Sequence, residues 1–173
     1  MPPPFHPDDV RKLLAACDRK ADLGLRNHAI VLGLLDSGLR LAEFASLRQG
    51  DINMRSGLAT VIGKGRKMRT VRFGAKARAA LARWLAVGGN VDPRDSLWRL
   101  SPRGLQIMLR RLGRKAGIEP CGAHRFRRTF ATLLKKGPGI YLHGLKLWYS
   151  MAWTNSRGSG PCFAGMGLTS KST

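Results

Sequence analysis

The stretch from Ser37 to Leu47 reads SGLRLAEFASL and lies between two predicted helices. Before it, Leu23 to Leu35 is apolar nearly all round, which is typical of a buried helix. Gly38 can take the left-handed conformation that commonly ends a helix. After it, apolar residues spaced by three and four predict a helix over residues 39–47, with Arg40 at its start.

Outward from this stretch, apolar spacing and turn residues predict the remaining elements. Asp8 or Asp9 is expected to cap a first helix, because short acidic side chains accept hydrogen bonds from free backbone N–H groups. Two short β-like runs joined by a glycine-containing turn predict a hairpin. Ser101 and Pro102 have the residue types of a helix start. The expected strands are Leu58–Ile62 and Arg69–Phe73. The expected later helices run from about Ala75 to Val87, from Ser101 to Gly113 or Gly117, and from Gly122 to Lys136.

Composition limits the function classes. The chain has 173 residues, with 31 Lys and Arg against 10 Asp and Glu, and a formal net charge of +21. This length indicates one domain, with enough apolar residues for a core, and no apolar run is long enough to span a membrane. The N-terminus lacks the features of a signal peptide. So large a positive charge favours a polyanionic partner, with nucleic acid ahead of an anionic membrane surface.

Cysteine spacing and a change of amino-acid composition near residue 137 give two further expectations. Cys17, Cys121 and Cys162 are odd in number and far apart, so they predict neither a disulfide framework nor a metal site. Residues 1–136 are expected to form the domain. Residues 137–173 contain no Asp or Glu and are expected to form an atypical Gly/Ser-rich tail, with a helix over 140–153 and disorder from Thr154.

Four basic groups have contexts that differ from a solvated charge run. Arg40 begins an apolar helix, and Lys64 lies between two glycines in the predicted hairpin turn. His124 and Arg127 are spaced i, i+3, so both project from one face of a helix. Each of these signals is weak alone, because a surface Arg, a turn Lys and a His-x-x-Arg pair all occur by chance.

Together, the order and spacing of these groups resemble the catalytic domain of the tyrosine recombinases, the phage integrase family. SGLRLAEFASL is similar to the family's first arginine box, VIGKGRKMRTV to its lysine hairpin, and AHRFRRTFAT to its second box, His-x-x-Arg. The resemblance covers about residues 5–136. It implies a mainly α fold with a small antiparallel β-sheet (α+β), and it makes residues 1–136 a catalytic-like domain.

The resemblance also implies roles in phosphoryl transfer on DNA. Arg40 and Arg127 would hold the non-bridging oxygens of the scissile phosphate, since a planar guanidinium matches that group. His124 would donate a hydrogen bond or transfer a proton, and Lys64 would protonate the leaving 5′-oxygen. Glu43 would orient or pack the first box rather than react.

The other cations near the boxes are expected to contact the phosphate backbone, with a solvated basic face as the alternative. The residues expected to bind DNA in this way are Arg66, Lys67, Arg69, Arg125 and Arg128, with Arg110, Arg111, Arg114 and Lys115 as further candidates. The partners implied are double-stranded DNA and other recombinase subunits. No membrane, metal or small-molecule cofactor is expected, and the expected location is the cytoplasm, in association with the nucleoid.

The sequence departs from the family pattern at both ends. The nucleophilic Tyr would fall near Ser159, whereas Tyr141 and Tyr149 come too early and are interpreted as partly buried aromatics. The hypothesis is a truncated form without that nucleophile, whose reading frame was interrupted near Gly137, unless a neighbouring subunit supplies a Tyr. The N-terminal helical domain that usually closes around DNA is also expected to be missing.

Two functions therefore remain open. The first is a DNA-binding site-specific recombinase or integrase, an enzyme class that breaks and rejoins DNA through a phosphotyrosine intermediate. The second is a non-catalytic DNA-binding accessory or competitor protein. An RNA-binding protein ranks below both, because Phe73 is the single aromatic residue in the two predicted strands.

Overall fold

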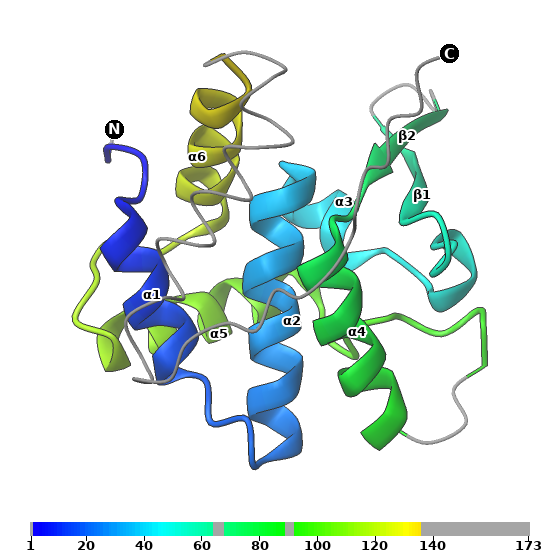
Figure 1. The fold of residues 1–173 in the computed structure, drawn as a ribbon, viewed down its shortest axis with the longest axis horizontal. Coiled ribbons are helices and arrows are strands. Elements are labelled where there is room, and N and C mark those ends of the chain that lie inside the picture. Colours follow the sequence, from blue (N-terminus) through cyan, green and yellow to red (C-terminus); the bar gives the residue numbers. More distant parts are fainter. Residues whose placement is uncertain (1, 64–67, 89–91, 136–173) are drawn as a thin grey trace, which may run out of the picture.

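Figure 1 shows the chain in a computed structural model that describes residues 2–63, 68–88 and 92–135. The predicted sites Lys64, Arg66 and Lys67, and the whole predicted tail 137–173, lie outside the described residues. The elements in chain order are α1 (Pro7–Ala16), α2 (Asp22–Ser37), α3 (Leu41–Ala45), the 3-10 helix η1 (Gln49–Asp51), β1 (Leu58–Ile62), β2 (Met68–Arg72), α4 (Ala75–Val87), α5 (Pro102–Lys115) and α6 (Ala123–Lys135).

Helix α2 is the centre of the packing. It contacts α1, α4, α6 and β2, and in Figure 1 it stands between α1 and α6 on one side and α4 on the other. Ile30, Val31 and Leu35 are completely buried, because neighbours cover α2 on several sides. This arrangement explains why the sequence of α2 is apolar nearly all round.

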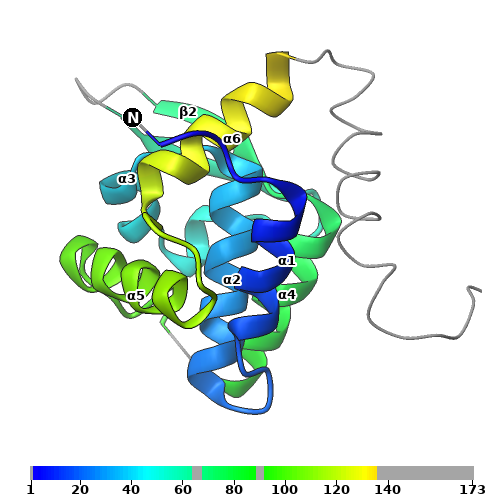
Figure 2. The ribbon, with the colours of Figure 1, turned by 90° about the vertical axis from the view of Figure 1, so that its left-hand side faces the viewer.

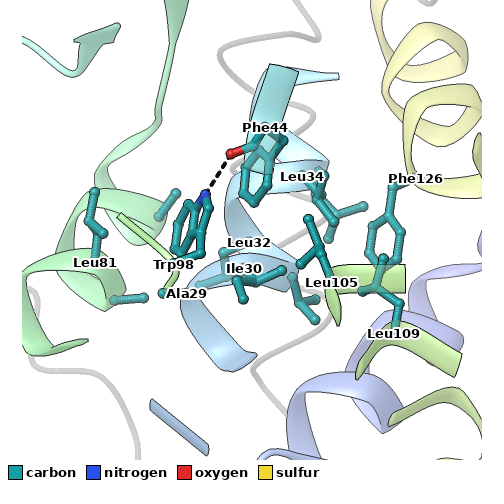
Figure 3. Close-up of a cluster of buried hydrophobic side chains, with 14 of the residues drawn as sticks. Ala29, Ile30, Leu32, Leu34, Phe44, Leu81, Trp98, Leu105, Leu109 and Phe126 are labelled. Carbon is teal, nitrogen blue, oxygen red and sulfur yellow. Dashed lines mark hydrogen bonds between the residues drawn. The ribbon is translucent and has the colours of Figure 1, made fainter. Parts of the chain in front are cut away.

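A second part of the core joins α3 to the segment before α5 (Figure 3). The rings of Phe44 and Trp98 are stacked, with centroids 4.7 Å apart and an interplanar angle of 11°. The Trp98 indole Nε1 also donates a hydrogen bond to the Phe44 carbonyl oxygen, at 2.8 Å. These contacts fix the short helix α3 against the rest of the domain.

The two strands form the predicted hairpin. They pair antiparallel, with a register that runs from Leu58 opposite Arg72 to Ile62 opposite Met68. Side chains on β1 alternate between exposed and buried, so one face of the hairpin packs inward. The predicted fold class, mainly α with a small antiparallel sheet, is confirmed.

Helix ends confirm some predictions and correct others. Gly38 ends α2 with φ of 57°, and the Ser101 hydroxyl accepts a hydrogen bond from the Gly104 N–H at 3.1 Å. The prediction that Asp8 or Asp9 caps α1 is wrong. His6 is the cap, because Pro7 occupies the first turn and the Asp9 carboxylate accepts from the His6 N–H at 3.1 Å.

Helix α3 is shorter than the predicted 39–47. Arg40 has an extended backbone, with φ −68° and ψ 151°, so the helix begins only at Leu41. Phe5, near the start of the chain, is held on α6, because its N–H donates to the Thr129 hydroxyl at 2.9 Å. In the three described ranges, the structure contains no helix that is both long enough and apolar enough to cross a membrane.

His28 in α2 makes stability depend on pH. It is 6% exposed, its Nε2 has no hydrogen-bond partner among the described residues, and burial lowers its pKa from 6.5 to about 4, with Arg19 and Arg83 adding repulsion. The unfolded chain binds the proton more readily, so stability is present above pH 6.5 and is lost as the pH falls toward about 4.

We therefore expect the free energy of unfolding to fall by about 2 kcal/mol between about pH 7 and about pH 5 through His28 alone. Urea unfolding of the native chain and of His28→Leu at both pH values measures this. The variant should lose most of the slope in this interval. An unchanged slope would assign the pH dependence to other groups.

Candidate nucleic-acid interface

A cationic pocket of about 1010 Å³ is lined by residues of α3, α5 and α6. Figure 2 shows α3, α5 and the beginning of α6 on the same side of the molecule. The predicted site residues Arg40, His124 and Arg127 all line it. Arg110 and Arg114 of α5 line the same pocket, whereas Glu119 is its one carboxylate among the described residues. The structure thus brings together side chains from two motifs that are far apart in the sequence.

Arg40 is placed by the start of α3. Its backbone N–H donates to Glu43 Oε2 at 2.9 Å, and its side-chain Nη1 donates to Glu43 Oε1 at 3.2 Å. The Arg40 side chain is nevertheless 58% exposed. The Arg40 guanidinium is therefore held through one nitrogen, Nη1, and its other nitrogens are open to solvent. A guanidinium that binds an anion needs such open donors.

Glu43 supports the first box, as the resemblance implies. Its side chain is 8% exposed, and Arg69 on β2 pairs with it through both nitrogens, at 3.1 and 2.7 Å. These bonds to Arg69, with further hydrogen bonds from Arg40, lower the pKa of the Glu43 carboxyl to about 2 against the opposing effect of burial. Glu43 is therefore ionised and occupied at both oxygens.

Arg127 is fixed against the end of α2. Its Nη1 donates to the Gly38 carbonyl oxygen at 3.0 Å, and Gly38 lies two residues before Arg40. His124 lies one turn earlier on α6 and is exposed at the pocket. The bond of Arg127 thus ties α6 to the end of α2, close in the sequence to Arg40.

The other predicted DNA-binding residues have different surroundings. Arg125 is 8% exposed; its guanidinium donates to the Pro3 and Pro120 carbonyl oxygens and pairs with Asp9 at 3.0 Å. It also lies over the Phe5 ring, at 4.2 Å from the centroid. These contacts give Arg125 a structural role, and its DNA contact stays a prediction.

Arg128 is exposed and donates to the Pro2 carbonyl oxygen at 3.3 Å, and Arg69 is engaged by Glu43. Sequence reasoning missed Gln106 and Glu119, which line the pocket. Neither belongs to a recognisable motif, and only the spacing of Gln106 four residues before Arg110 on a basic helix could have indicated it.

The chemistry of the pocket is that of an oxyanion site, because its guanidinium groups present fixed donors with permanent charge. Groups of this kind can accept an anion such as a phosphate group. A family model described as "Phage integrase family" matches residues 4–140. The chain belongs to the phage integrase family, that is, to the tyrosine recombinases.

Similar proteins agree with this assignment. Tyrosine recombinase XerC of Actinobacillus pleuropneumoniae serotype 7 (strain AP76) is 33% identical over 147 residues, which are 80% of this chain and 48% of that protein. The crystal structure of XerA recombinase has a TM-score of 0.68 at 28% identity, and the match covers 83% of this chain and 53% of the other. A XerH recombinase bound to its difH substrate has a TM-score of 0.62 at 26% identity, and the match covers 86% of this chain and 46% of the other. The chain spans about half the length of the curated relatives it matches.

Proposed function

We propose that this chain binds double-stranded DNA and holds one backbone phosphate in the pocket lined by Arg40, His124 and Arg127. The single observation that supports this most strongly is the convergence of these three residues on one exposed cationic pocket. The net charge of +21 provides the long-range attraction to DNA. The side chains of Arg40 and Arg127 each make one hydrogen bond inside the protein, so they retain further donors for phosphate oxygens.

The reaction proposed for such a site is site-specific strand exchange. A tyrosine oxygen attacks the phosphorus and its proton passes to His124, the bond to the 5′-oxygen breaks, and Lys64 gives that oxygen a proton. The charge that develops on the non-bridging oxygens is stabilised by Arg40 and Arg127. The tyrosine would be Tyr141, Tyr149 or one from another recombinase subunit, and all these are proposals about residues outside the described ranges.

Other parts of the proposal follow from the same function. Arg128 is exposed within the second box and would contact the phosphate backbone, as would Arg66 and Lys67, which lie between the two strands in the sequence. Other recombinase subunits are proposed partners. A protein with this function would work on the chromosome, in the cytoplasm and at the nucleoid.

Arg127→Ala is expected to lower the affinity for a random-sequence duplex about tenfold and to make the slope of log K against log salt less steep by about 0.9, because one phosphate contact is lost. Fluorescence anisotropy over a salt series measures both. The matched control is Arg83→Ala, an exposed arginine on α4 outside the pocket, which should change neither. Equal losses in the two variants, with both shown to be folded by thermal unfolding, would contradict a specific phosphate site.

A nicked suicide substrate separates a recombinase from a DNA-binding accessory protein. A covalent adduct on a denaturing gel that disappears in Tyr141→Phe or Tyr149→Phe indicates strand cleavage by that residue. Retained DNA binding without an adduct, with the salt dependence described above, indicates the accessory function instead. A mixture of chains with and without the two tyrosines shows whether a neighbouring subunit supplies the nucleophile.

A further inference from the structure

Arg69, expected from the sequence to contact DNA, makes its contacts inside the protein. Its two terminal nitrogens donate to the two oxygens of Glu43, Nη1 to Oε1 at 3.1 Å and Nη2 to Oε2 at 2.7 Å. This paired geometry is the strongest form of a charge-assisted hydrogen bond between side chains. We propose that Arg69 is a positioning residue, which acts through Glu43 to keep Arg40 free for phosphate; this rests on the proposed function.

Glu43 is shared between two arginines. The oxygen that accepts from Arg69 Nη1 also accepts from Arg40 Nη1, at 3.2 Å. The oxygen that accepts from Arg69 Nη2 also accepts from the Arg40 backbone N–H, at 2.9 Å. Arg69 therefore occupies the paired position on the carboxylate and leaves Arg40 with one side-chain bond.

That division determines what Arg40 can do. Within the described residues, the Nε and Nη2 groups of Arg40 make no hydrogen bond, and its side chain is 58% exposed beside the pocket. Without Arg69, the nearly buried carboxylate of Glu43 would be paired with Arg40 alone. Arg40 would then close onto Glu43 with two nitrogens, since an ionised and poorly solvated carboxylate strongly favours a paired guanidinium.

Arg69 also joins two of the family's motifs. It lies on β2 opposite Val61, and Lys64 lies between the two strands in the sequence, whereas Glu43 lies in α3, which begins directly after Arg40. The ion pair at 2.7 Å thus ties the hairpin to the first arginine box. A direct contact with DNA that used Nη1 and Nη2 of Arg69 as a fork would compete with this pair.

The first test needs no DNA. Carbon-detected NMR of the full chain follows the titration of the Glu43 carboxyl, and nitrogen-detected spectra follow the guanidinium group of Arg40. In Arg69→Gln, the pKa of Glu43 should rise from about 2 toward its ordinary value of 4.5, and the Arg40 side chain should become less mobile. Arg72→Gln, an exposed arginine on the same strand, is the control and should change neither signal. An Arg40 signal that does not respond to Arg69→Gln overturns the proposal.

The second test uses a double-mutant cycle with a random-sequence DNA duplex. Arg69→Gln should weaken binding about fivefold in the native chain and have almost no effect in Arg40→Gln, because it acts through Arg40. Arg69→Lys should behave like Arg69→Gln, since an ammonium group cannot replace the two parallel N–H donors of a guanidinium.

A direct phosphate contact predicts the opposite results. The effects of Arg69→Gln and Arg40→Gln would then be additive, each with a change of about 0.9 in the salt slope, and Arg69→Lys would keep most of the affinity. If the native chain binds no DNA, the proposed function fails, and the NMR comparison still decides whether Arg69 positions Arg40. The two failures are therefore distinguishable.

Discussion

Gly38→Ala is expected to lower the free energy of unfolding by about 3 kcal/mol, because the change adds strain in the backbone to a clash in the core. Gly38 has φ of 57°, a conformation that disfavours any side chain. A Cβ atom there would lie 2.1 Å from Cδ1 of Phe130, in α6. The Phe130 ring and α6 would have to move, and Arg127 would move with them, away from the Gly38 carbonyl that it now contacts at 3.0 Å.

Two other glycines separate these causes. Gly117 also has a positive φ, of 67°, but a Cβ there would meet nothing within 4 Å, so Gly117→Ala should cost about 1 kcal/mol. Gly122 has equally open surroundings without the positive φ, and Gly122→Ala should be close to neutral. Urea unfolding of the three variants measures the differences. If Gly38→Ala costs no more than Gly117→Ala, then the contact with Phe130 is not a constraint on the fold.

Much of the fold could be predicted from local sequence. Helices α2, α4, α5 and α6 were expected within a few residues of their observed bounds, because each has an apolar pattern ended by glycine or begun by a capping residue. The start of α1 was missed because histidine is a rare cap beside two aspartates. The buried segment around Trp98 was missed because it has no regular period, so only the tertiary contact with Phe44 reveals its place.

The sequence could predict which residues line the pocket, but not the hydrogen bonds and ion pairs between them. Motif spacing brought out Arg40, His124 and Arg127, which do line one pocket. Charge alone could not distinguish an arginine that faces DNA from one that pairs with a distant acid. Arg69 and Glu43 are 26 residues apart, and Arg125 and Asp9 are 116 residues apart, so both pairs exist only because of the fold.

Trp98→Ala is expected to have the largest effect on stability, a loss of about 4 kcal/mol. Trp98 is 1% exposed and stacked on Phe44, which is itself completely buried, so the change leaves a large cavity under α3. It also removes the indole donor to the Phe44 carbonyl. Because Phe44 directly follows Glu43, loosening this contact should also release the carboxylate that holds Arg40.

Trp98→Phe separates packing from hydrogen bonding. The smaller ring keeps most of the stacking on Phe44, and the lost donor should cost only about 1 kcal/mol, since the Phe44 carbonyl also accepts from the Leu47 N–H at 3.4 Å. Chemical unfolding gives both stabilities, and DNA affinity measured where Trp98→Phe is fully folded reports on Arg40. We expect Trp98→Phe to keep nearly native affinity. If Trp98→Phe is as unstable as Trp98→Ala, the indole hydrogen bond rather than the ring packing fixes α3, because the two variants differ mainly in whether a ring fills the space.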